Sequence, residues 1–151
     1  MKKIQKPYAL FIGDAPDMLA AKTAIGVRDW RPDDCIVQVK LSGCAIHLGL
    51  ESLTIEEAAN RGAKTLMIGV ANRGGVIPNN WLQTMLDEGV NTSEQQAWIH
   101  NAMGSVYRYW EGHDIEAEKQ FLHAASVAPS SVPGIAGARL AEKLYPKSRT
   151  Q

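Results

Sequence analysis

The sequence predicts an α/β fold in which a three-stranded parallel sheet with flanking helices precedes an all-helical C-terminal segment. Two patterns support this prediction. In the first 90 residues, short apolar runs alternate with helical runs, an order that is typical of parallel sheets. After residue 90 the strand signal ends and helical patterns continue. Of the 151 residues, 45% are hydrophobic, which is enough for a buried core.

The first β-α-β unit opens with an apolar run that ends in glycine, which predicts a strand over residues 8–13. Pro16 suits the first turn of a helix. Apolar residues then recur at helical spacing until Gly26, which we expect at or near the end of this helix. A loop at residues 30–34 leads to a second strand, residues 35–40, which is rich in β-branched side chains.

A capping box marks the second helix. The side chain of Thr54 accepts a hydrogen bond from the first turn while Glu57 reaches back to the Thr54 amide, and Gly62 ends the helix. Residues 42–53 before it are predicted to be irregular. The third strand, residues 64–70, is almost wholly apolar. A final helix follows, so the order β-α-β-α-β-α predicts a Rossmann-like sheet that is covered on both faces.

The C-terminal part carries helical patterns only. Two helical runs, residues 94–110 and 115–127, are followed by a short helix over residues 135–144. We therefore divide the chain into a Rossmann-like α/β domain, residues 1–90, and a helical extension, residues 91–151.

One segment of the helical extension weakly resembles a single tetratricopeptide repeat. The segment runs from His100 to Pro129, and the pattern needs one extra residue between Tyr107 and Gly112. Because such repeats bury their faces only by stacking on neighbours, we prefer a plain helical pair over a peptide-binding groove. Its expected core residues are Trp98, Met103, Tyr107, Phe121 and Leu122.

Composition narrows the classes of partner. The 16 Lys and Arg residues balance 16 Asp and Glu residues, so no basic excess favours nucleic acid or a membrane surface. No long apolar stretch or signal sequence is predicted, and the expected location is cytoplasmic. Cys35 and Cys44 are expected to be free thiols. Neither they nor the four histidines have metal-ligand spacing, so no metal site is predicted.

Candidate ligand-binding residues lie after the first and third strands. Ligands of such sheets bind at the carboxyl ends of the strands, and these two loops are neighbours if the sheet order is 2-1-3. Glycine allows close approach to a ligand, helix N-termini favour anions, and arginine grips carboxylate or phosphate. The predicted ligand is therefore a small anion. The alternative is that these residues form only turns and caps. The candidates are Gly13, Asp14, Asn72, Arg73, Gly74 and Gly75.

Five segments resemble the N-terminal domain of the D-glutamate N-acetyltransferase family, whose members are often labelled NAD-dependent epimerases or dehydratases. They are residues 7–17, 20–23, 30–32, 48–50 and 69–76, the last reading GVANRGGV. The resemblance implies a Rossmann-like N-terminal domain, acetyl-CoA as a cofactor, and a further domain with a P-loop. Because the sequence does not extend into such a domain, we expect acetyl transfer to need a missing domain or a partner subunit.

Two other functions stay open. A non-catalytic interaction module would use Trp98, Tyr109 and Trp110 of the helical half to bind a partner or a second copy. An NAD-dependent epimerase or dehydratase is the second alternative, but the sequence contains neither G-x-G-x-x-G nor a P-loop motif. No catalytic residues are assigned, because no nucleophile and base can be paired from sequence order alone.

Overall fold

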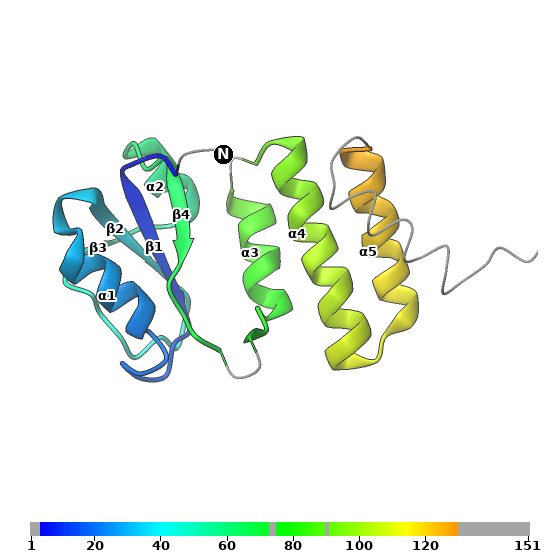
Figure 1. Ribbon diagram of the computed structural model, residues 1–151, viewed down its shortest axis with the longest axis horizontal. Helices are drawn as coiled ribbons and strands as arrows, with labels where there is room; N and C mark the ends of the chain where they lie inside the picture. The colour runs from blue at the N-terminus through cyan, green and yellow to red at the C-terminus, as the bar shows by residue number, and fades with distance from the viewer. Residues whose placement is uncertain (1–3, 73–74, 90, 130–151) are drawn as a thin grey trace, which may run out of the picture. The chain divides into compact units, whose positions relative to one another are not determined.

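The computed structural model describes residues 4–72, 75–89 and 91–129, and the chain divides into two compact units (Figure 1). Unit 1 is Met1–Gly75 and unit 2 is Val76–Gln151. This division falls earlier than the predicted boundary between residues 90 and 91. The reason is that helix α3 (Asn79–Glu88), which we had assigned to the α/β domain, packs against helix α4 (Ser93–Val106).

Unit 1 is built on a parallel sheet of four strands in the order β3-β2-β1-β4. The predicted α/β class and three of its strands are therefore confirmed, but the predicted strand number is wrong by one. Tyr8 of β1 pairs with Cys35 of β2 on one side and with Thr65 of β4 on the other. The strands are β1 (Tyr8–Gly13), β2 (Cys35–Lys40), β3 (Glu51–Ser52) and β4 (Thr65–Ile68).

The strand that the sequence did not reveal, β3, is only two residues long and exposed. It pairs with Val37 and Gln38 of β2. The Gln38 side chain is fully buried, and its Nε2 donates to Ser52 Oγ at 2.6 Å while its Oε1 accepts from the Leu48 amide at 2.6 Å. A buried amide must be hydrogen-bonded, so Gln38 fixes β3 and the preceding loop without any apolar pattern.

Helix α1 (Lys22–Trp30) begins and ends later than predicted. Pro16 does not open it, because Asp17 instead forms a turn in which its Oδ1 accepts from the Ala20 amide at 2.8 Å. Gly26, predicted at or near the helix end, lies in the middle of α1. The next predicted helix is confirmed as α2 (Ile55–Asn60), with both hydrogen bonds of the Thr54–Glu57 capping box formed.

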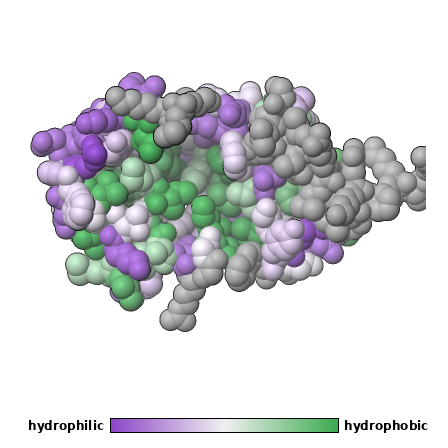
Figure 2. All heavy atoms as spheres, viewed as in Figure 1, coloured by the Kyte–Doolittle hydropathy of each residue, from purple (hydrophilic) through white to green (hydrophobic). Residues whose placement is uncertain are grey.

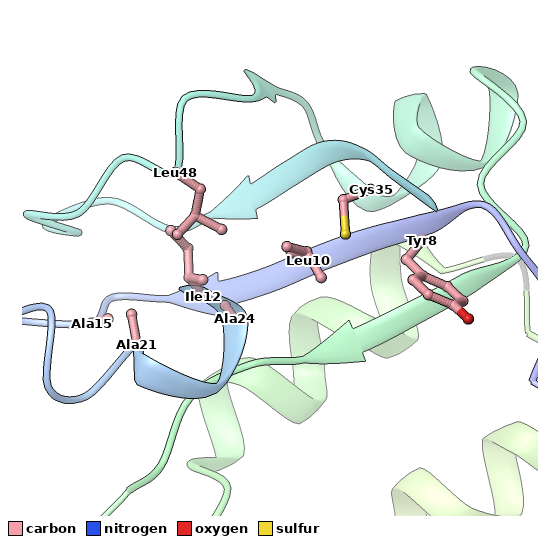
Figure 3. Close-up of a cluster of buried hydrophobic side chains, with 8 residues drawn as sticks. All are labelled: Tyr8, Leu10, Ile12, Ala15, Ala21, Ala24, Cys35 and Leu48. Atoms are coloured by element: carbon pink, nitrogen blue, oxygen red, sulfur yellow. The ribbon is translucent and has the colours of Figure 1, made fainter. Parts of the chain in front are cut away.

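The core of unit 1 lies between α1, β1 and the loop before β3 (Figure 3). Tyr8, Leu10 and Ile12 of β1 point to one face of the sheet, where α1 covers them. Contact between helix and sheet is closest at Gly69, after β4, whose carbonyl accepts from the Ala24 amide at 2.9 Å. A Cβ at Gly69 would lie 2.3 Å from the Ala24 Cβ and 2.8 Å from its Cα. Only glycine fits this position.

Unit 2 contains α3, α4 and α5 (Asp114–Val127). A short π-helical turn, η3 (Tyr107–Glu111), follows α4. Such a turn accommodates one more residue than an α-helical turn. The turn begins at Tyr107, and the tetratricopeptide pattern needs its extra residue between Tyr107 and Gly112. The short helix predicted over residues 135–144 lies outside the described residues.

Contact between α4 and α5 depends on small residues. A Cβ at Gly104 would lie 2.6 Å from the ring of Phe121, which is 1% exposed. Ala97 and Ala124 are also fully buried. Met103 is buried as predicted, whereas Trp98 and Leu122 are 55% and 49% exposed and are not core residues.

Gly69→Ala is expected to destabilise the protein by about 1–3 kcal/mol, the usual cost of overpacking, because Ala24 cannot withdraw without moving the α1 backbone. Gly26→Ala is the matched control. Its added methyl meets nothing within 4 Å, so removing a mid-helix glycine should stabilise by roughly 0.5–1 kcal/mol. Urea unfolding measures both, and equal effects of the two changes would contradict this account.

His100 should make the stability of unit 2 depend on pH. Burial, together with nearby His123, lowers the pKa of His100, although a 2.7 Å hydrogen bond to Gln120 opposes the shift. The unfolded chain therefore takes up the proton first, and stability should fall as pH drops below about 6.5. Thermal unfolding between neutral and acidic pH should show this loss, and His100→Gln should reduce it. An unchanged pH profile in that variant would contradict the assignment.

Candidate functional site

The sheet order brings the two predicted site loops together. Because β1 lies directly beside β4 and runs parallel to it, the carboxyl ends of both strands meet at one edge of the sheet. The Gly69 amide donates to Phe11 O at 2.8 Å, and the Ala71 amide donates to Ala20 O at 2.8 Å. The loops after β1 and β4 are therefore joined by backbone hydrogen bonds. The three predicted strands lie in the order 2-1-3 that makes these two loops neighbours.

A third loop, which follows β2, joins the same edge. The Leu41 amide donates to Gly13 O at 2.8 Å, and the Ala45 amide donates to Ala15 O at 3.2 Å. The thiol of Cys44, which is half-buried, lies 3.7 Å from the Ala15 carbonyl oxygen. Sequence reasoning did not include this loop, although its position after a strand next to β1 was the available signal.

The structure places four of the six candidate residues. Gly13 is buried at the end of β1 with φ +52°, and Gly75 is exposed with φ +71°, so both use backbone that favours glycine. Asp14 is exposed, and Asn72 is half-buried. Arg73 and Gly74 lie outside the described residues. Asp14 does not cap α1, which begins at Lys22, so the interpretation of Asp14 as a helix cap is wrong.

The N-terminus of α1 lies at this edge, but its amides are largely engaged. The Lys22 amide donates to Leu19 O at 3.4 Å and the Ala24 amide to Gly69 O at 2.9 Å. The Ala24 bond holds the helix to the end of β4, the Lys22 bond closes the turn before the helix, and neither amide is available to an anion. A ligand at this edge would therefore be held by side chains and loop backbone more than by the helix terminus.

Two cysteines of unit 1 have side chains that the structure describes. Burial, with the adjacent Asp34 carboxylate, raises the pKa of the Cys35 thiol, which therefore stays protonated and is a poor nucleophile. Both cysteines are free thiols, as predicted.

Within the described ranges, no three His, Cys, Asp or Glu side chains are grouped to hold a metal ion. In the same ranges, no helix has the length and apolar character needed to cross a membrane.

Comparison with known proteins supports the α/β fold. Residues 40–92 match the model of a domain of unknown function, DUF1611_N, which is described as a Rossmann-like domain. This agrees with the parallel sheet of unit 1.

Two curated relatives share a name and are similar to more than half of this chain. The chain is 53% identical over 103 residues to a D-glutamate N-acetyltransferase from Tritonibacter scottomollicae, a match that covers 66% of this chain and 30% of the relative. It is 42% identical over 92 residues to a D-glutamate N-acetyltransferase from Pseudoalteromonas sp., which covers 59% of this chain and 28% of that relative. The resemblance seen in the sequence is confirmed, and the chain spans less than a third of the length of these relatives.

Proposed function

We propose that unit 1 binds a small anionic metabolite at the carboxyl ends of β1 and β4, and that D-glutamate or its N-acetyl derivative is the ligand class. One observation supports the site more than any other. The loops after β1 and β4 are hydrogen-bonded neighbours, with the Ala71 amide 2.8 Å from Ala20 O, so that Asp14 and Asn72 follow adjacent strands. The name of the two relatives supports the choice of ligand.

The chemistry of D-glutamate fits the residue types at this edge. The exposed carboxylate of Asp14 can accept from an ammonium group, and the Asn72 amide can both donate to a carboxylate and accept from an amine. Arg73, predicted from the sequence to bind the ligand carboxylate, follows Asn72 directly. The glycine at position 75 allows the backbone to approach the ligand.

Acetyl transfer is a separate step in this proposal. The match covers 30% or less of each relative, and the Cys35 thiol of unit 1 is a poor nucleophile. We therefore propose that acetyl-CoA binding and catalysis depend on a further domain or a partner subunit, and that this unit contributes the amino-acid site.

An interaction module is the second candidate, and exposed aromatic residues of unit 2 favour it. Trp98 and Tyr109 are 55% and 66% exposed, and tryptophan and tyrosine are enriched where proteins bind one another. The side chain of Trp110 lies outside those that the structure describes. No observation favours the NAD-dependent alternative.

Thermal unfolding with D-glutamate, N-acetyl-D-glutamate, acetyl-CoA and L-glutamate tests the ligand proposal. A ligand at about 100 times its Kd should add about 2.7 kcal/mol of stability. Asp14→Asn and Asn72→Ala should each reduce this gain. Asp33→Asn is the matched control, because Asp33 is an exposed carboxylate beyond the other end of α1. The proposal fails if no compound raises the melting temperature, or if Asp33→Asn reduces the gain as much as Asp14→Asn.

A further inference from the structure

A shallow apolar groove runs along α1, away from the candidate ligand residues. Its volume is about 870 Å³, and none of the four candidate residues that the structure describes lines it. One wall is a stripe of α1 at helical spacing i, i+3, i+4 and i+7, formed by Thr23, Gly26, Val27 and Trp30. Met67 of β4 belongs to the opposite side. Hydrophobic side chains also reach the surface among polar ones on the face that Figure 2 shows.

The geometry of the sheet explains why this groove exists. A helix is about 10 Å wide and neighbouring strands are about 4.8 Å apart, so one helix covers roughly two strands. The sheet has four strands. On the face of Tyr8, Leu10 and Ile12, α1 and the loop containing Leu48 form the cover. The groove lies on the β4 side of α1, where there is space for one more helix.

Gly26 marks this stripe as a contact surface. A glycine in the middle of a helix costs about 1 kcal/mol relative to alanine. No residue that the structure describes requires it, because a Cβ there would meet none of their atoms within 4 Å. A glycine that faces an open groove lets another backbone approach closely, which gives this position a physical reason.

The openness of the groove favours a protein occupant over a small molecule. Small-ligand sites bury about 70–90% of the ligand. Here Trp30 is 88% exposed and Ile4 is 61% exposed, so a small molecule would stay largely in solvent. An exposed tryptophan is a common anchor of protein interfaces.

The charged residues in and beside the groove make this surface self-complementary, because a cation lies at one end of the stripe and an anion lies near the other. Lys22 lies at one end of the α1 stripe, and Trp30 lies at the other, next to a recess that contains Asp33 and Asp34. Asp34 is already paired with Lys6 at 2.9 Å and with Arg31 at 3.5 Å, whereas Asp33 is exposed. If two α1 helices cross antiparallel at Gly26, each Lys22 faces Trp30 and Asp33 of the other copy.

We propose that a second copy of this chain occupies the groove, with the two α1 helices packed antiparallel about a two-fold axis at Gly26. Such an interface must be self-complementary. Lys22 of each copy lies over the Trp30 indole of the other, a cation–π contact, and beside its Asp33 carboxylate. The residues of this surface differ from the candidate ligand residues and from the exposed aromatic residues of unit 2, and only Lys22 lies at the end of α1 that is near the ligand edge.

Sedimentation of the full chain over a concentration series tests this interface. The wild type should show a monomer–dimer equilibrium, and Trp30→Ala should raise the dimer dissociation constant by at least about tenfold. Gly26→Leu should do the same, and at concentrations where the wild type is monomeric it should not lower the melting temperature, because a Cβ at this position meets no described atom within 4 Å. Trp98→Ala is the control with an exposed tryptophan of unit 2, and it should leave the dimer unchanged.

A charge exchange makes the test specific to the antiparallel pair. Lys22→Glu and Asp33→Lys should each weaken the homodimer, because like charges then face one another. An equal mixture of the two variants should form a heterodimer, in which both charge pairs are restored. A chain that is monomeric at every concentration overturns the proposal. So does a dimer that responds to Trp98→Ala instead of Trp30→Ala, or a mixture that associates no better than either variant alone.

Discussion

The close packing of α1 on the end of β4 is the constraint on which the carboxyl edge of unit 1 depends. The Ala24 amide donates to Gly69 O at 2.9 Å, and the missing Cβ of Gly69 lets the two backbones meet. The same contact places the loop after β1 against the loop after β4. The candidate ligand residues are therefore positioned by the backbone contact between Ala24 and Gly69, in which their own side chains take no part.

A single buried polar side chain performs a similar task at the other side of the sheet. Gln38 satisfies both ends of its amide, with Ser52 Oγ and the Leu48 amide, each at 2.6 Å. In a low-dielectric core an unpaired amide is costly, so these bonds are strong constraints on the chain around them. They hold β3 in the sheet and bring Leu48 over the core. The cover on this side of α1 is thus a loop, while the β4 side keeps an open groove.

The two units place their exposed aromatic residues differently. In unit 1, Trp30 ends a helical stripe that borders a groove, with charges at both ends. In unit 2, Trp98 and Tyr109 are exposed on a helical pair whose close contact uses Gly104 and Phe121. The first arrangement carries opposite charges at its two ends, as a self-complementary interface with a second copy requires. The two surfaces can be separated by single substitutions, because Trp30 and Trp98 belong to different units.

The sequence by itself determined the α/β class, strands β1, β2 and β4, the capping box of α2, and the resemblance of the first half to D-glutamate N-acetyltransferases. These features are local, because apolar runs, caps and motifs are written in neighbouring residues. Tertiary structure decided the two-residue strand β3, the late start of α1, the exposure of Trp98, the third loop at the ligand edge and the groove along α1. The strand, the third loop and the groove depend on contacts between residues far apart in the chain, such as Gln38 with Ser52 and Gly69 with Ala24, which no local pattern records. The late start of α1 has a local cause, the turn that Asp17 forms with Ala20.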